Sequence, residues 1–98
     1  MPPLAKSAPR PYLEAMKLLY FALFRSRIGR GEEEVEAPAG VATVGDLVDW
    51  LARRGPGYRA ALADLRLVKV AVNQEYVGFD HPVGPLDEVA LFPPVTGG

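Results

Sequence analysis

Hydrophobic and polar residues alternate along the chain in several short stretches, and this pattern predicts a sheet of about four to five strands. The first stretch carries charge only at its odd positions. Its even positions are therefore predicted to face the core, and they are Leu18, Tyr20, Ala22 and Phe24. The predicted strands cover residues 17–25, 32–36, 68–72, 76–79 and 88–92.

A helical pattern lies between the second and third predicted strands. Thr43 is a favourable N-cap residue, and Asp46 three positions later completes a capping pattern. One apolar stripe follows at helical spacing, formed by Val44, Leu47, Val48 and Leu51. Gly55 and Pro56 predict the end of this helix. The same spacing then predicts a second short helix through Tyr58, Ala61, Leu62 and Leu65.

The predicted order is two strands, a helix that crosses the sheet, a short helix and three strands, which is the layout of a small α+β roll. We divide the chain into a flexible arm (residues 1–15), a folded domain (residues 16–92) and an extended tail (residues 93–98). The arm holds four of the ten prolines and has no apolar periodicity. It is either a natural extension or the result of an early start site, and the sequence leaves both open.

The apolar run that follows the arm is short. Residues 18–24 are only seven residues long, and three arginines follow them without a small-residue cleavage site. This disfavours a secretory signal, and no run approaches the roughly 20 apolar residues that cross a bilayer. We therefore expect a cytoplasmic protein without a membrane partner.

Composition removes several chemistries from consideration. The 98-residue chain has no cysteine and one histidine, and 11 basic against 12 acidic residues leave a net charge of −1. It can form no disulfide, thiolate nucleophile or cysteine-ligated metal site, and its charge argues against a nucleic-acid partner. His81 lacks companions for a triad or metal site, and no glycine-rich phosphate loop is present. We expect the chain itself to bind neither metal nor ATP, and Glu32–Glu34 to form a solvated face.

The candidate chemistry lies in the last six residues. Pro93 and Pro94 remove two backbone donors and end the last strand. Gly97 and Gly98 have no Cβ, so they can enter a channel too narrow for other residues. The tail thus presents a free carboxylate away from the core. Once activated, for example as an acyl-adenylate, that group can accept sulfur or an amine.

Residues 71–98, AVNQEYVGFDHPVGPLDEVALFPPVTGG, resemble the C-terminal third of the sulfur-carrier subunit of molybdopterin synthase, a MoaD-type protein. The opening MKLLYFALFRSRIG (residues 16–29) resembles the first strand of that family, so the resemblance covers residues 16–98. It implies a ubiquitin-like β-grasp fold with one main crossing helix and a second short one. The segment Gly84-Pro85-Leu86 departs from the more polar turn that the family often has.

The resemblance also implies a reaction cycle. An activating enzyme would adenylate Gly98 with ATP, and a sulfur donor protein would convert Gly98 to a thiocarboxylate. The carrier would then insert its tail into the large synthase subunit and donate sulfur to cyclic pyranopterin monophosphate. The expected assembly is a 2+2 heterotetramer with the catalytic residues in the large subunit. No cofactor is expected on this chain.

The same resemblance and the strand parity together indicate the residues that meet the large subunit. Phe21, Tyr76 and Phe92 are predicted to point away from the core and to form an apolar patch, with Arg25 beside it. The alternative is a second small core under helices or loops. The tail residues Pro93, Pro94, Val95 and Thr96 are expected to enter the partner. Residues 70–98 carry four acids and no lysine or arginine, which predicts a basic partner surface around the tail.

Three functions remain open at this point. The resemblance favours the sulfur carrier for molybdopterin. A carrier for thiamine biosynthesis or a ubiquitin-like protein modifier would share the fold and the Gly97-Gly98 terminus. A non-covalent β-grasp interaction domain would use the fold alone, with an incidental diglycine.

Overall fold

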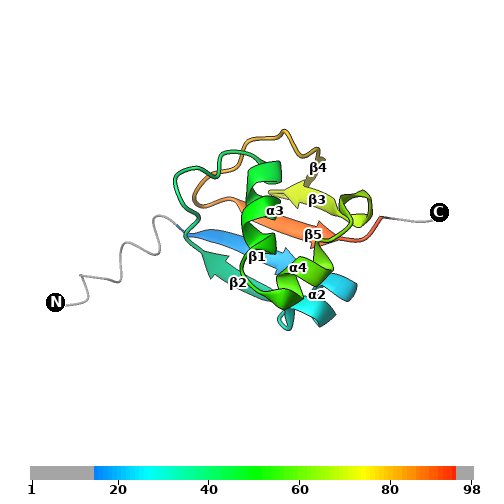
Figure 1. Cartoon of the computed structure of the whole chain (residues 1–98). Coiled ribbons are helices and arrows are strands. Elements are labelled where there is room, and N and C mark those ends of the chain that lie inside the picture. The colour runs from blue at the N-terminus through cyan, green and yellow to red at the C-terminus, as the bar shows by residue number, and fades with distance from the viewer. Residues whose placement is uncertain (1–14, 95–98) are drawn as a thin grey trace.

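The sheet of the computed structural model has five strands in the order β2-β1-β5-β3-β4, and the structure describes residues 15–94. The parallel pair β1 and β5 lies at its centre, and the other neighbours are antiparallel. Figure 1 shows the crossing helix lying over these strands. The bounds are β1 Met16–Tyr20, β2 Glu32–Val35, β3 Lys69–Val72, β4 Glu75–Val77 and β5 Glu88–Phe92.

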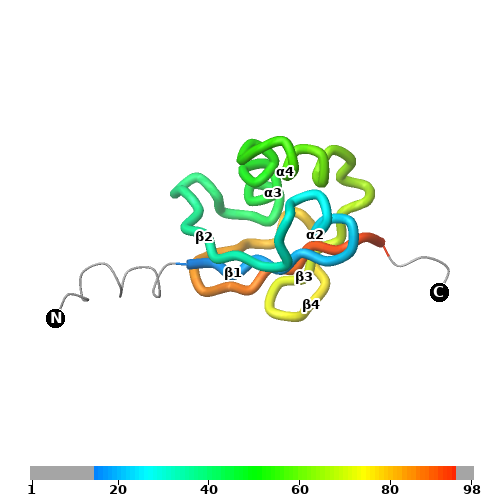
Figure 2. The backbone as a smooth tube through the Cα atoms, turned by 90° about the horizontal axis from the view of Figure 1, so that it is seen from below, coloured from blue at the N-terminus to red at the C-terminus, as the bar shows by residue number. Residues whose placement is uncertain are grey.

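The helical elements are short. They are α2 Leu23–Ile28, α3 Val44–Ala52, α4 Pro56–Ala61 and the 3-10 turn η2 Leu65–Leu67. Figure 2 shows α3 and α4 on one side of the sheet. No helix of the described residues is long and apolar enough to cross a membrane.

The core lies between the sheet and the main helix. Helix α3 buries the predicted stripe of Val44, Leu47, Val48 and Leu51. Its N-terminus has the predicted capping box, because the Asp46 amide donates to the Thr43 hydroxyl and the Asp46 carboxylate accepts from the Thr43 amide. Amide hydrogen bonds from Ala42 and Thr43 lower the pKa of the Asp46 carboxyl. The sheet contributes Leu18, Tyr20, Val70, Val72, Val89 and Leu91 to the same core.

The predicted first strand, residues 17–25, is wrong after Tyr20. Ala22 takes a left-handed φ of 54°, which breaks the strand, and helix α2 follows at once. Phe24 is buried as the parity predicts, but from a helix. Gly29, at φ 95°, ends this helix with an amide that donates to the Arg25 carbonyl.

Two further expectations need correction. Leu65 is not part of the second helix, which ends at Ala61, and its side chain is about half exposed.

The acidic run is not simply a solvated face, because the Glu33 side chain is only 6% exposed. It accepts hydrogen bonds from the phenols of Tyr20 and Tyr58. This network joins β1, β2 and α4.

The β3–β4 hairpin turns on two residues in the left-handed region, Asn73 at φ 51° and Gln74 at φ 73°. Such a turn favours asparagine followed by glycine. The Asn73 side chain also bonds the Asp87 carboxylate and the Glu88 amide, so it ties the turn to the start of β5. Only Gln74 is therefore poorly matched to its conformation.

We expect Gln74→Gly to raise the free energy of unfolding by about 0.5–1 kcal/mol, because glycine removes the left-handed strain. Urea unfolding of both proteins measures the difference. Gln74→Ala keeps the strain and serves as the control, with no gain expected. Equal gains in both variants would contradict this account.

Candidate functional site

An aromatic pair lies on the face of the sheet opposite to α3 and α4. The ring centroids of Tyr76 and Phe92 are 5.4 Å apart with their planes at 49°. Strand β3 separates them, with Ala71 opposite Tyr76 and Lys69 opposite Phe92. Tyr76 is 77% exposed, so the alternative of a second small core is wrong for this residue.

The pair borders a groove at the base of the tail, which we call the tail groove. It holds about 480 Å³ and is lined by Lys69, Val70, Tyr76, Val77, Gly78, Phe92 and Pro94. Sequence reasoning missed four of these residues, because their place follows from the registers of β3 with β4 and β5; they are Lys69, Val70, Val77 and Gly78. The groove is open and largely apolar, which suits a protein side chain more than a small polar ligand.

Phe21 extends the same face from β1. Its amide donates to the Leu91 carbonyl at 3.1 Å, which places it beside the end of β5. Leu19 and Ala90, two residues before Phe21 and Phe92, lie opposite each other in β1 and β5. We call Leu19, Phe21, Ala71, Tyr76, Ala90 and Phe92 the sheet-face patch. The three predicted aromatics thus share one face, and their role in binding a partner stays a prediction.

Arg25 lies at the margin of this patch. It is exposed, and its guanidinium packs against Gly31. Arg25 and Phe21 line a second hollow together with Leu19, Tyr20, Gly31 and Glu32. The structure therefore brings Arg25 next to Phe21, and its role in binding a partner stays a prediction.

Only the first two tail residues lie within the described part of the chain. Pro93 and Pro94 follow β5 and are half-buried. The remaining predicted site residues, Val95, Thr96, Gly97 and Gly98, lie outside the described residues. Figure 1 shows that the chain leaves the domain at the same end of the sheet as α2.

The acidic residues of segment 70–98 do not surround the tail. Glu75 follows the β3–β4 turn, and Asp87 and Glu88 lie at the start of β5, so all three occupy the opposite end of these strands. Asp80 lies beside the N-terminus of α3, where the Phe79 carbonyl accepts from the Gly45 amide. The expected basic partner surface therefore loses its basis, because sequence proximity to the tail is not proximity in space.

His81 has a structural position in the loop before β5. Its carbonyl accepts from the Val44 amide, and its Nδ1 lies 2.8 Å from the Pro82 carbonyl oxygen. Within residues 15–94 no group of three His, Cys, Asp or Glu side chains could hold a metal ion. The site features of the described residues are the exposed sheet-face patch, the tail groove and the base of the tail.

Comparisons with known proteins agree with this geometry. The model of the ThiS family matches residues 18–98. The chain is 45% identical over 83 residues to the molybdopterin synthase sulfur carrier subunit of Escherichia coli, covering 85% of this chain and 99% of that protein.

Solved structures give the same result for the fold. SAMP1 from Haloferax volcanii has a TM-score of 0.64 and 31% identity, covering 86% of this chain and 99% of that one. A chain of the BexX/CysO complex from Amycolatopsis orientalis has a TM-score of 0.61 and 32% identity, covering 86% and 100%. These likenesses confirm the predicted ubiquitin-like β-grasp roll.

Proposed function

The chain belongs to the ThiS family, and from this premise we propose that it is the sulfur-carrier subunit of a molybdopterin synthase. The likeness to the Escherichia coli carrier subunit over nearly that protein's full length supports the role. The observation that carries the proposal is the diglycine terminus of a tail whose base, Pro93 and Pro94, follows β5 at an exposed apolar sheet face.

The proposed chemistry takes place at Gly98. Its carboxylate attacks the α-phosphate of ATP on an activating enzyme, which releases pyrophosphate and leaves an acyl-adenylate. A hydrosulfide ion released by a donor protein then displaces AMP from the acyl carbon, and the terminus becomes a thiocarboxylate. The carrier donates this sulfur to cyclic pyranopterin monophosphate and returns to a carboxylate after hydrolysis. ATP is a substrate of the activating enzyme and no cofactor of this chain.

The proposed partner is the large subunit, which supplies the catalytic residues. It would cover the sheet-face patch and take the tail into its own channel, with Arg25 at the margin of the contact. Exposed aromatics of this kind are frequent anchors of protein interfaces. Two carriers on a dimer of large subunits is the proposed assembly.

Intact-mass analysis tests the function and separates its alternatives. The full chain is incubated with ATP, an activating enzyme and a sulfur donor, and then with a large subunit and the pterin precursor. We expect the mass gain of one oxygen-to-sulfur exchange at the terminus and its loss when molybdopterin forms. An unchanged carboxylate in the presence of an active activating enzyme would refute the carrier function.

The likeness to SAMP1, the small archaeal modifier protein 1 of Haloferax volcanii, favours a second candidate function. A protein modifier would form isopeptide adducts with other proteins, which the same mass analysis detects. A thiocarboxylate that serves only thiazole formation would point instead to thiamine biosynthesis.

We expect Tyr76→Ser to weaken binding of the large subunit at least tenfold while stability stays within about 0.5 kcal/mol, because this ring is exposed. Titration calorimetry measures the affinity. Leu86→Ser is the matched control, since Leu86 is 66% exposed but lies outside the sheet-face patch. Equal effects of the two substitutions would exclude the patch as the interface.

A further inference from the structure

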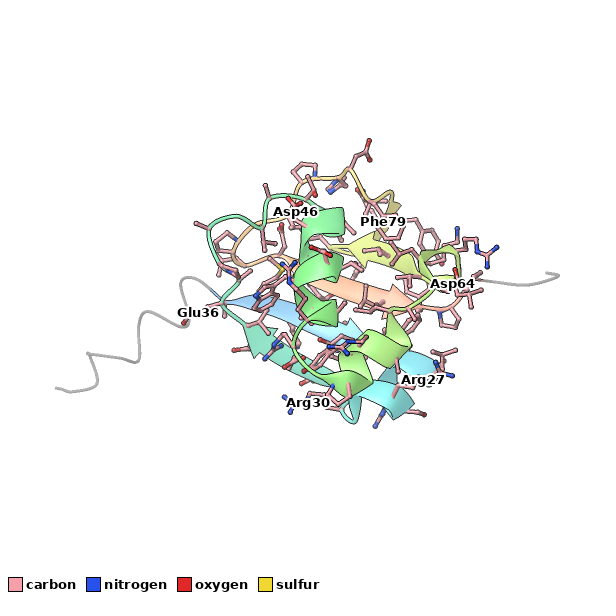
Figure 3. The ribbon with its side chains drawn as sticks, viewed as in Figure 1. Arg27, Arg30, Glu36, Asp46, Asp64 and Phe79 are labelled. Carbon is pink, nitrogen blue, oxygen red and sulfur yellow. The ribbon has the colours of Figure 1, made fainter. Side chains whose placement is uncertain are left out.

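Five exposed cations surround the end of the domain from which the tail leaves. They come from four elements, namely Arg25 and Arg27 of α2, Arg59 of α4, Arg66 of η2 and Lys69 of β3. Strand pairing places Lys69 opposite Phe92, immediately before the tail. In Figure 3, Arg27 and Asp64 lie at this end and Glu36 lies at the other. We call these five residues the exit cations.

Close packing of α2 on α4 holds two of these elements together. The Arg27 guanidinium donates to the Ala60 carbonyl at 3.2 Å. A Cβ at Gly57 would overlap the Arg27 carbonyl oxygen, so only glycine permits this approach. The two helices that carry Arg25, Arg27 and Arg59 are therefore held against each other.

Few acidic side chains balance the exit cations; Glu32 lines the hollow beside Arg25, but its carboxylate lies 4.0 Å from the Lys17 ammonium. Within residues 15–94, only Arg66 of the five forms an ion pair, with Asp64 at 2.9 Å. Many of the acids gather at the far end, including Glu34, Glu36, Glu75, Asp87 and Glu88. The domain therefore has a charge asymmetry along the direction of its strands, although the net charge of the chain is only −1.

The arrangement of the exit cations favours a protein surface over a small anion. The tail groove contains Lys69 alone of the five, and the hollow beside Phe21 contains Arg25 alone. The cations are thus distributed around the tail and do not converge on one pocket. A phosphate site would bring several of them to one point.

We propose that the exit cations dock on an acidic rim around the channel of the large subunit that receives the tail. This rests on the proposed function and adds the charge of the receiving surface. A receptor that holds the tail in a channel must bring the rim of that channel against the surface from which the tail leaves. A neutral or basic rim would desolvate the cations without providing opposite charge, whereas an acidic rim offsets the cost of desolvation by pairing with them.

The charge asymmetry also has a kinetic consequence. The field of an acidic rim attracts the basic end of the domain and repels its acidic end. The carrier therefore approaches with its tail first. Such steering raises the association rate constant at low salt and fades as the Debye length shortens.

Association kinetics of the full chain with the large subunit test this proposal. At low salt we expect Arg59→Glu to lower the association rate constant about threefold, and Arg59→Glu with Arg66→Glu about tenfold, with a shallower salt dependence. Arg53→Glu is the matched control, because Arg53 is also an exposed arginine but pairs with Asp49 on α3. It should stay within about twofold of the wild type.

The outcomes separate this inference from the proposed function. Equal association rate constants and equal salt dependence for Arg59→Glu and Arg53→Glu would overturn the inference. The proposed function would still stand in that case if the wild-type chain binds the large subunit. Saturable binding of ATP or inorganic phosphate by the chain alone, lost in Arg59→Glu, would also overturn it in favour of an anion site. A wild-type chain that fails to bind any large subunit would refute the proposed function itself.

Discussion

Deletion of Gly98 is expected to abolish sulfur transfer to the pterin precursor, with a loss of at least 100-fold. The deletion draws the terminal carboxylate back by one residue, roughly 3.3–3.6 Å. Misplacement of a reacting group by 1 Å can already cost about 100-fold, so the shortened tail cannot present its carboxylate to either enzyme. Molybdopterin formation with saturating partners measures the loss, and the intact mass shows whether a thiocarboxylate forms.

Fold and docking should survive this deletion. The sheet-face patch and the core lie in residues 16–92, and β5 ends at Phe92. Circular dichroism and large-subunit affinity are therefore expected to match the wild type. Addition of one glycine after Gly98 should cause a comparable loss by moving the carboxylate outward, whereas Thr96→Ser keeps the tail length and should retain activity. Full activity of the deletion variant would exclude Gly98 as the sulfur acceptor.

The main helix is the part of the fold that the sequence predicts best. Helix α3 has a capping box and two full turns of apolar spacing, and the structure confirms both signals. The parity of the strands likewise places Tyr76 and Phe92 on the outer face, where the structure shows them paired.

Helix α2 is invisible to the same reasoning. Its six residues are too few to show a helical period, and the aromatic run before it imitates a strand. The break falls at Ala22, whose left-handed φ has no glycine or asparagine to announce it. The exit cations follow from this element, because a continued strand would not have placed Arg27 beside α4.

Glu33 shows a second limit of sequence reasoning. A run of three glutamates predicts a solvated face, yet Glu33 lies opposite Leu18 on the inner side of β2. Its Oε2 accepts from the phenols of Tyr20 at 2.6 Å and Tyr58 at 2.7 Å. These donors are 13 and 25 positions away, so no local pattern could indicate them.

Two arginines complete the Glu33 network. Its Oε1 accepts from Arg30 at 3.2 Å and from Arg54 at 3.3 Å. The Arg54 guanidinium in turn lies 5.1 Å from the ring centres of both Trp50 and Tyr58. The carboxylate thus joins edge strand β2 to β1, to α4 and to the end of α3.

Replacement of Glu33 by alanine is therefore expected to lower the free energy of unfolding by about 3 kcal/mol, because it leaves the Tyr20 and Tyr58 phenols without an acceptor. Denaturant unfolding measures the loss. Glu34→Ala is the matched control, since this neighbour in β2 is exposed, and it should change stability by less than about 0.5 kcal/mol. Equal losses in the two variants would mean that Glu33 is solvated after all.

The pH dependence of stability tests the charge of Glu33 separately from the packing of its side chain. Burial favours the neutral form of Glu33, but the hydrogen bonds from Tyr20 and Tyr58 and the charges of Arg54 and Arg30 outweigh it, so the pKa is lowered. The ionised Glu33 carboxylate therefore stabilises the fold fully at pH values above 4.5, the pKa of this group in the unfolded chain. This stabilisation is lost as the pH falls through the lower pKa of the folded state. Glu33→Gln removes the titrating group while keeping one acceptor oxygen, so its stability should fall less steeply than that of the wild type below pH 4.5. Parallel acid unfolding curves for the two proteins would show that Glu33 has the same pKa in the folded and unfolded states.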